Sequence, residues 1–555
     1  MLDNHDISDI LSKYAKLYEL HEGNPFKVKA TAAAAYNIKK IGEPLASMTE
    51  EQLQKVPQLG KSIAPKVLEI IQTGSFADLD ALIEATPQGV QDILRIKGLG
   101  PKKVEHLWKT VGISSIPELL DACRENRLVE AKGFGYKTQA QILSDIEFKF
   151  SNEGKFHWAK VSPIVDLLEQ ALSESSEVKQ FEIVGDYRRL NDIVESIDVL
   201  VVCDDLQALS EELSDSGFEL HDCDDTHYIL RYAEVVTVNI YMTSYERWGN
   251  DLLEKTATPE HLELINYRSL NEDFEDEESI YTALNLPFVL PELREGLQEL
   301  QHLEQQSQLI TYKDLKGVLH NHSTYSDGLH TLQEMAIHAK SMGLEYFGIC
   351  DHSQTASYAN GLKPERVLEQ MHEIDRLNNQ LTPFKIFKGI ESDILSDGSL
   401  DYTPDILQLF DIVVASVHSN LGMDMEKAHL RLKGAIENPF TSILGHPTGR
   451  LLLMRTGYPI DHRYIIDACI ANGVAIELNA HPYRLDIDWR WIDYAVEKGG
   501  LISINPDAHQ KEGLSDMTYG VNVARKGYLT PANCLNAKNL QEFMQWIDLK
   551  KQRKA

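Results

Sequence analysis

The chain is short of cysteine, of long apolar runs and of basic residues, and each shortage narrows what it can be. Its 555 residues include six scattered cysteines and no Cys-x-x-Cys pair. This usage argues against a disulfide framework and fits a reducing compartment. No apolar run approaches the ~18 residues of a membrane-spanning helix, and the first residues lack the basic and apolar parts of an export signal. We therefore expect a cytoplasmic protein with no membrane partner.

The deficit of basic residues limits where a nucleic acid could bind. Lys and Arg number 54 against 85 Asp and Glu, so the net charge is −31. A nucleic-acid-binding surface is usually basic where it touches phosphate. Any contact with DNA must therefore come from local basic patches. The apolar content of 43% is ample for globular cores, and a chain of this length is expected to hold several domains.

The stretch Leu319–Asp327 carries the first candidate ligands for a metal ion. His320 and His322 are two positions apart, so in an extended segment their imidazoles point to the same face. They follow an apolar Gly-Val-Leu run, and Asp327 adds a carboxylate a few residues later. One His-x-His pair is weak evidence, because a polar strand end gives the same pattern.

The next two hundred residues repeat this arrangement. Short apolar runs recur about every 30 residues, the length of one βα unit, and helix-like stretches such as 331–341 and 462–471 separate them. The pattern predicts a parallel β/α barrel or near-barrel with its ligands at the carboxyl ends of the strands. Each run ends in a potential ligand: His352, Glu391, His418, His446, Glu477 and Asp507, with His509 two residues further on.

Residues 315–555 resemble the PHP (polymerase and histidinol phosphatase) domain. The resemblance rests on an ordered set of motifs: His320-Asn-His322, Asp327-Gly, Asp351-His352, Gly389-Ile-Glu391, Val417-His418-Ser, Gly445-His446-Pro and Asp507-Ala-His509. It implies a distorted seven-stranded β/α barrel with a cluster of three divalent metal ions. By resemblance the ligands are His320, His322, Glu391 and Asp507 for one ion, Glu391, His418 and His446 for a second, and Asp327, His352 and His509 for the third.

Such a cluster has a definite chemistry. His and carboxylate ligands together suit Mn²⁺, Zn²⁺ or Fe²⁺, and the sequence does not choose among them. Clustered divalent ions lower the pKa of a metal-bound water and stabilise charge on phosphate oxygens, so phosphoester hydrolysis needs no side-chain nucleophile. Asp351, Glu477 and Arg450 lie beside ligands or strand ends, where they could orient ligands or hold phosphate. For these three, a plain salt bridge is an equally good reading.

The first 150 residues have a mostly helical pattern interrupted by three glycine-containing turns. Each turn places glycine between two helices and a basic residue at the start of the second, which suits a phosphate at the helix N-terminus. The turns resemble helix-hairpin-helix motifs that bind the DNA backbone without reading bases. The residues expected to contact DNA are Gly60 and Lys61 in the first turn, Gly98, Gly100, Lys102 and Lys103 in the second, and Gly133, Gly135 and Lys137 in the third.

The segment Phe181–Val202 resembles the palm motif of family X DNA polymerases, and with the hairpins and the PHP motifs nearly the whole chain resembles the bacterial members that carry a PHP extension. The palm motif is degenerate. Asp186 stands where a Ser is expected, Ser196 where the first Asp of Asp-x-Asp198 is expected, and Thr237 where the third Asp is expected. Nucleotidyl transfer needs carboxylates to hold Mg²⁺. We therefore expect an impaired polymerase site, with Mg²⁺ required only if that site is active.

The resemblance also implies a domain order, and we expect a multidomain α/β chain with a nucleotidyltransferase-like (α+β) palm and a (β/α)7 PHP barrel. The segment 295–308 reads as a helical connector. The predicted boundaries are 1–80 for an eight-kilodalton-like helical domain, 81–150 for fingers, 151–240 for palm, 241–300 for thumb, 301–314 for a linker and 315–555 for the barrel.

The function implied is metal-dependent hydrolysis of phosphodiesters at DNA 3′ ends, gaps or nicks, as a 3′-5′ exonuclease in repair. Three alternatives stay open. The chain could keep both polymerase and exonuclease activity, although Ser196 and Thr237 argue against this. It could be a histidinol-phosphatase-like enzyme acting on small molecules, although the hairpins would then be unexplained. It could be a DNA-end scaffold without catalysis, although the complete ligand set argues against that.

Overall fold

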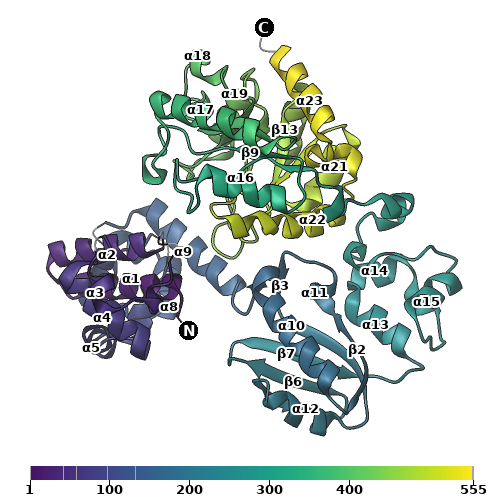
Figure 1. Ribbon diagram of the computed structural model, residues 1–555. Coiled ribbons are helices and arrows are strands. Elements are labelled where there is room, and N and C mark those ends of the chain that lie inside the picture. Colours follow the sequence, from purple (N-terminus) through teal and green to yellow (C-terminus); the bar gives the residue numbers. More distant parts are fainter. Residues whose placement is uncertain are drawn as a thin grey trace. The chain divides into compact units, whose positions relative to one another are not determined.

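A computed structural model describes residues 2–39, 41, 43–57, 59–96, 98–131 and 133–552. The chain, drawn in Figure 1, divides into two compact units, Met1–Glu153 and Gly154–Ala555. No helix in these ranges is long and apolar enough to cross a bilayer.

The first unit is helical, as expected. Its core is built by the apolar faces of short helices, with Ile7, Leu11 and Leu17 on one helix and Val67 and Ile70 on another fully or almost fully buried. The helices are α1 (Asn4–Leu20), α2 (Pro25–Ile38), α3 (Glu50–Leu53), α4 (Gly60–Thr73), α5 (Ala77–Ala85), α6 (Gln88–Ile93), α7 (Pro101–His106), α8 (Ile116–Arg124) and α9 (Tyr136–Ser151).

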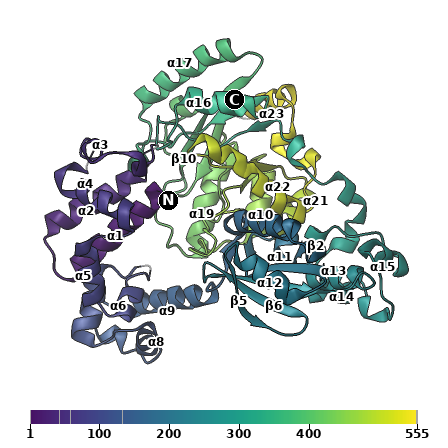
Figure 2. The same ribbon diagram turned by 60° about the horizontal axis from the view of Figure 1, so that its bottom comes forward.

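The second unit begins with a five-stranded sheet in the order β2-β4-β7-β6-β5. Helices α10 and α12 pack on one face through a shared apolar cluster, and Figure 2 shows these helices beside the strands. On the other face, Trp248 and Leu252 of α13 (Trp248–Thr256) pack against Leu200 and Val202. The elements are β1 (Phe156–His157), α10 (Trp158–Glu174), β2 (Val178–Val184), α11 (Gly185–Arg188), β3 (Ile193–Val194), β4 (Ile197–Cys203), α12 (Leu206–Ser214), β5 (Phe218–Cys223), β6 (His227–Tyr232) and β7 (Val236–Met242).

A helical segment and a turn-rich connector follow. The helices are α13 (Trp248–Thr256), α14 (Pro259–Leu264) and α15 (Glu277–Ala283). The predicted helix over 295–308 is wrong: the structure has 3-10 turns at Glu299–Gln301 and Leu303–Gln308, with another at Tyr312–Asp314. Buried Glu299 accepts backbone N–H groups from Gly296 and Leu297 and pairs with His261. These side-chain contacts replace the backbone ladder of an α-helix.

The carboxyl-terminal part is a nearly closed seven-stranded parallel barrel, as predicted. The strands lie in sequence order, and a bridge between Asn321 and Ala508 joins the ends of the first and last. They are β8 (Gly317–Val318), β9 (Tyr346–Ile349), β10 (Lys385–Asp393), β11 (Ile412–Ser416), β12 (Ile443–Leu444), β13 (Ala475–Asn479) and β14 (Ile502–Asn505), with α16 (Leu332–Ser341), α17 (Pro364–Leu381), α18 (Pro404–Leu407), α19 (Met425–Ile436), α20 (His462–Ala471), α21 (Ile492–Glu497), α22 (Met517–Lys526) and α23 (Leu540–Gln552) between and after them.

The alternation of side chains along the strands fills the barrel and its shell. On β11, Ile412 and Val414 belong to the inner cluster, while Val413 and Ala415 pack against the outer helices. At the amino end of the strands Phe543 of α23 stacks on Tyr346 with ring centroids 4.6 Å apart. The amino end of the barrel therefore contains an apolar core, and the predicted ligands lie at the opposite, carboxyl end.

Candidate metal centre

The barrel brings all nine predicted ligands to the carboxyl ends of its strands. Each follows or ends a strand: His320 and His322 come after β8, Glu391 lies on β10, and Asp507 follows β14. The remaining predicted ligands lie in the loops that follow strands, as the βα periodicity predicted: Asp327 after β8, His352 after β9, His418 after β11, His446 after β12 and His509 after β14. Most are buried, and the most exposed is His509, with a side-chain exposure of 39%. Their role as ligands stays a prediction, but their convergence is observed.

Glu391 is the hub of the cluster. Its oxygens lie 3.3 Å from His320 Nε2, 3.7 Å from His322 Nε2, 2.9 Å from His352 Nδ1, 3.1 Å from His418 Nε2 and 3.1 Å from His446 Nε2. Five imidazoles around one carboxylate is the arrangement expected of a ligand shared between ions.

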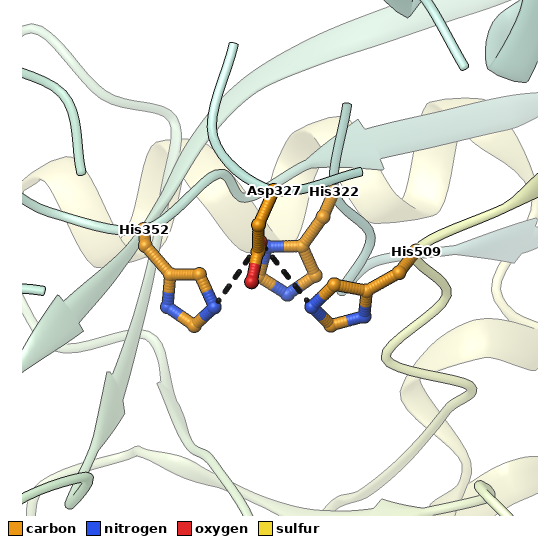
Figure 3. Close-up of side chains that lie close together, drawn as sticks. All are labelled: His322, Asp327, His352 and His509. Carbon is orange, nitrogen blue, oxygen red and sulfur yellow. Dashed lines mark ion pairs between the residues drawn. The ribbon is translucent and has the colours of Figure 1, made fainter. Parts of the chain in front are cut away.

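A second group centres on Asp327. Figure 3 shows His352 and His509 pointing at its carboxylate from either side, at 3.6 and 3.4 Å, with His322 beside them. His322 lies within reach of both groups, because its Nε2 is 3.7 Å from Glu391 Oε2 and one of its ring nitrogens lies within 4.8 Å of a ligand atom of Asp327. The ligand atoms form three compact groups, each within 4.8 Å: His322, Asp327, His352 and His509; His320, His322 and Glu391; and His352, Glu391 and His418. These groups overlap the predicted sets without matching them, so the assignment of ligands to particular ions stays a prediction.

The donor atoms fit a group of divalent ions. Several buried polar atoms here have no hydrogen-bond partner among the described residues, and such orphans are rare in protein interiors. Two ligands, His446 (φ +23°) and Asp507 (φ +53°), also hold backbone conformations that non-glycine residues seldom adopt. The orphaned atoms are His320 Nε2, His322 Nδ1, Asp327 Oδ1, His352 Nδ1, Glu391 Oε2 and His446 Nδ1.

The electrostatics agree with this fit. Burial alone would raise the pKa of Glu391, but the imidazoles of His418, His320 and His352 hold that pKa well below its usual value. Burial lowers the pKa of His418, yet Glu391 and Asp393 together raise it to about 10. Without cations this centre therefore draws in protons, which metal binding would displace.

Carboxylates outside the predicted ligand set orient the imidazoles. Glu477 accepts from His320 Nδ1 at 2.7 Å, as suggested by the sequence, and Asp393 accepts from His418 Nδ1 at 2.6 Å. Asp393 was missed, although its place two residues after Glu391 on β10 was a usable signal. Asp351 accepts bonds from Ser323, Ser326 and Gln370 and so fixes the loop between His322 and Asp327 rather than a ligand itself.

The arginine near the centre is not the one suggested by the sequence. Arg450 pairs with Asp488 at 2.6 Å and donates to the carbonyls of Arg484 and Leu485. Arg484, which sequence reasoning missed, places Nε 3.8 Å from Asp507 Oδ2, beyond hydrogen-bond range. Its guanidinium makes no hydrogen bond to the residues that the structure describes, and its side chain is 20% exposed.

The palm-like sheet shows what occupies the degenerate positions. Asp198 on β4 lies opposite Asn239 on parallel β7, and Asn239 donates to its carboxylate at 2.6 Å, while Ser196 donates at 2.8 Å. Thr237 lies two residues earlier on the same strand, opposite Arg231 of β6. The residue facing Asp198 is thus an amide, and β7 contains no carboxylate.

The two arginines of the palm motif are bound within the protein. Arg189 pairs with Asp186 and lies 3.2 Å from Glu295. Arg188 forms a two-pronged pair with Glu277 at 3.0 Å on both nitrogens.

The three amino-terminal turns each precede an α-helix, as predicted, and the third follows the 3-10 helix Leu128–Glu130. Gly60, Gly98 and Gly133 have φ of +51°, +80° and +91°, which explains glycine at those positions. Gly100 and Gly135 have negative φ, and a Cβ added at either would meet no heavy atom of the described chain within 4 Å. The fold itself therefore does not require glycine at Gly100 and Gly135.

The basic residues of the turns lie at the surface. Lys61, Lys102 and Lys137 are exposed, whereas Lys103 is half-buried and donates to the Gly98 carbonyl at 3.2 Å. The backbone N–H groups at a helix N-terminus attract an anion, and a nearby lysine adds positive charge.

Known families match three parts of the chain. Residues 2–76 match the family described as "Helix-hairpin-helix domain", residues 90–147 the "SAM-like Helix-hairpin-helix tandem", and residues 319–481 the "PHP domain". Fold and site together thus define a metal-dependent hydrolase of the PHP class.

Relatives of full and partial length refine this. The chain is 33% identical to "DNA polymerase/3'-5' exonuclease PolX" of Bacillus subtilis over 98% of this chain and 99% of that protein. It therefore belongs to the family X DNA polymerases that carry a PHP domain. Its barrel region alone is 29% identical to a "Probable phosphatase" of Acetivibrio thermocellus and 27% identical to one of Thermoanaerobacter, covering 42% of this chain and 95% and 96% of those proteins.

Proposed function

We propose that this chain is a DNA-binding 3′-5′ exonuclease whose barrel hydrolyses phosphodiesters with divalent metal ions, in a cytoplasmic repair process. The observation that carries the proposal is the nine-residue cluster around Glu391 and Asp327 at the mouth of the barrel. A full-length relative named as a DNA polymerase and 3'-5' exonuclease supports DNA as the substrate.

The nine residues would hold three ions of Mn²⁺, Zn²⁺ or Fe²⁺. When bound, these ions would activate water and neutralise charge on the phosphoryl oxygens. Glu477 and Asp393 fix the rings of His320 and His418 by accepting their second N–H, which keeps the ligating nitrogen turned to the centre. Arg484 can bind a phosphate oxygen beside Asp507.

The polymerase site of this chain is proposed to be inactive. Mg²⁺ would find one carboxylate at Asp198, where Ser196 and Asn239 already donate to it. The Asp186 carboxylate pairs with Arg189. Arg189 is therefore not free to bind a triphosphate, and the Asp186 carboxylate would repel the phosphate charge. In this reading the palm is a scaffold for the barrel.

The amino-terminal turns would hold the DNA backbone. A Cβ added at Gly100 or Gly135 would meet no atom of the described chain within 4 Å. The absence of a side chain at these positions lets a phosphate approach the backbone closely. Contacts of this kind are independent of sequence. They suit an enzyme that acts at DNA ends, gaps or nicks.

The test uses a 5′-labelled primer on a gapped template with Mn²⁺, with and without dNTPs, for the wild type and His320→Ala. Shortening by the wild type, loss of shortening in the variant and no extension by either is the expected result. Extension by either protein would restore the bifunctional alternative.

A small-molecule phosphatase is the second candidate, because the barrel region resembles two proteins named as probable phosphatases. Turnover of a phosphomonoester without any shortening of DNA would favour it.

The glycine turns give a prediction on DNA affinity. Gly100→Ala with Gly135→Ala is expected to weaken binding of gapped DNA several-fold, because the added methyl groups occupy the space that a phosphate needs. Stability should be unchanged or raised by about 0.4–1 kcal/mol, since both positions have negative φ. Fluorescence anisotropy in low salt measures the binding. Gly422→Ala is the matched control, because a Cβ there also meets no atom within 4 Å of the described chain; equal affinity of all variants would remove the turns from the interface.

A second prediction concerns Arg484. Arg484→Ala is expected to lower kcat/KM for DNA shortening roughly 10- to 100-fold, the worth of one charge-assisted hydrogen bond to phosphate, and Arg484→Lys should recover part of the loss. Steady-state kinetics on a labelled single-stranded 3′ end measures both. Arg490→Ala, at an exposed arginine of the next turn, should leave kcat/KM unchanged; the same loss there would mean a general charge effect.

A further inference from the structure

A second group of potential ligands lies outside the barrel mouth. His302 comes from the connector before the barrel, and Asp493 and Glu497 come from the short helix α21. One ligand atom from each lies within 4.8 Å of the other two. His302 is 7% exposed, so its ring is almost fully buried against the barrel.

The surroundings of His302 fix its ring and its proton. The imidazole stacks on Tyr528 with centroids 4.2 Å apart and 24° between the planes. Its Nδ1 lies 2.6 Å from Gln305 Oε1, an atom that only accepts, so Nδ1 carries the proton. In the neutral ring Nε2 therefore presents a lone pair.

That lone pair faces another acceptor. Nε2 lies 3.2 Å from Asp493 Oδ2, yet it is buried without a hydrogen-bond partner among the described residues. Glu497 adds a second carboxylate that forms no hydrogen bond or ion pair with the described chain. Burial raises the pKa of Asp493, a protonated His302 would lower it, and the charge of Glu497 raises it. With the His302 ring neutral, three acceptors converge with no donor between them.

We propose that His302, Asp493 and Glu497 bind a divalent transition-metal ion such as Zn²⁺, distinct from the ions of the barrel centre. Zn–N and Zn–O bonds of about 2.0–2.2 Å place two neighbouring ligand atoms about 3.2 Å apart near a tetrahedral angle, which is the separation of His302 Nε2 and Asp493 Oδ2. Asp493 and Glu497, four apart on a helix, present their carboxylates on one side. Water completes the coordination.

The ion has a structural role in this arrangement. It ties the 3-10 connector to the barrel shell at α21, where the connector otherwise has few backbone ladder bonds of its own. Because neither Asp493 nor His302 belongs to the barrel mouth, the site is independent of the proposed nuclease function.

The test counts metal in the full chain. Wild type, His302→Ala and Glu497→Gln are stripped with chelator, loaded with Zn²⁺, freed of excess and measured by mass spectrometry of the metal. The wild type should hold about one ion per chain more than His302→Ala. Since Glu497 is exposed, Glu497→Gln should fold normally and bind this ion roughly 10- to 100-fold more weakly. His372→Ala, at an exposed histidine of α17, should keep the full count.

Equal metal content in all four proteins would overturn the proposal and leave a protonated His302 paired with Asp493. A loss of several ions in His302→Ala would also overturn it, because the variant would then act on the barrel centre. DNA shortening measured on the same samples separates the two sites. Glu497→Gln should shorten DNA at the wild-type rate. If the wild type shows no nuclease activity, the metal count still tests the His302 site.

Discussion

Replacing Glu391 by Gln is expected to lower the rate of DNA shortening by roughly 10³-fold or more. Its two oxygens reach five imidazoles within 3.7 Å, so no other residue touches as many predicted ligands. A neutral amide can neither bridge two cations nor offset their charge. The loss should appear in kcat, since the ions act on the reacting phosphate rather than on distant DNA.

Metal content distinguishes this effect from misfolding. Glu391→Gln should bind fewer ions per chain while its circular dichroism and its affinity for gapped DNA stay at wild-type values. His338→Ala, on the outer helix α16, is the matched control and should retain the wild-type rate. A Glu391→Gln protein with full activity would show that the cluster is not the catalytic centre.

Much of the barrel could be predicted because its signal is periodic. Each strand is a short apolar run, and its register places alternate residues inside and outside, as Val413 and Val414 show on β11. Parallel strands end at the same edge, so the residues that follow them must converge. The convergence of these strand-end residues could therefore be predicted from the sequence, whereas their assignment as ligands comes from the resemblance to the PHP domain and stays a prediction.

Contacts between distant segments could not be read in this way. Arg450 follows a predicted ligand motif, but its guanidinium binds Asp488 of another loop rather than a residue of the metal centre. Arg484 approaches Asp507 only because the loop after β13 folds back toward β14. The residue opposite Asp198 depends on strand register, and a shift of two residues moves that position from Thr237 to Asn239.

The two arginines of the palm motif have partners within the protein. Arg188 is bound by Glu277 and Arg189 by Glu295. Glu277 also binds Arg294, which is fully buried. The palm motif thus forms a buried ionic network, and this network continues into the barrel.

Lys526 is the barrel's contribution to that network. It lies at the end of α22 and is fully buried, and its Nζ donates to the Arg189 carbonyl at 2.8 Å, the Glu292 carbonyl at 3.1 Å and Glu295 Oε1 at 2.5 Å. Burial lowers the pKa of this lysine, while Glu295 raises it. A single ammonium group therefore joins the palm motif, the connector and the barrel.

Lys526→Met is accordingly expected to lower the free energy of unfolding of the second unit by about 3 kcal/mol. The substitution removes the lysine donor from two carbonyls and leaves the Glu295 carboxylate with Arg189 as its charged partner. Urea unfolding followed by tryptophan fluorescence measures the loss. Lys433→Met, at an exposed lysine, should change it by less than about 0.5 kcal/mol. Adding Glu295→Leu to Lys526→Met should recover part of the stability only if the unpaired charge causes the loss, although Arg189 then loses a partner as well. If Lys526→Met matches Lys433→Met, the Lys526 contacts add no measurable stability to the junction of palm and barrel.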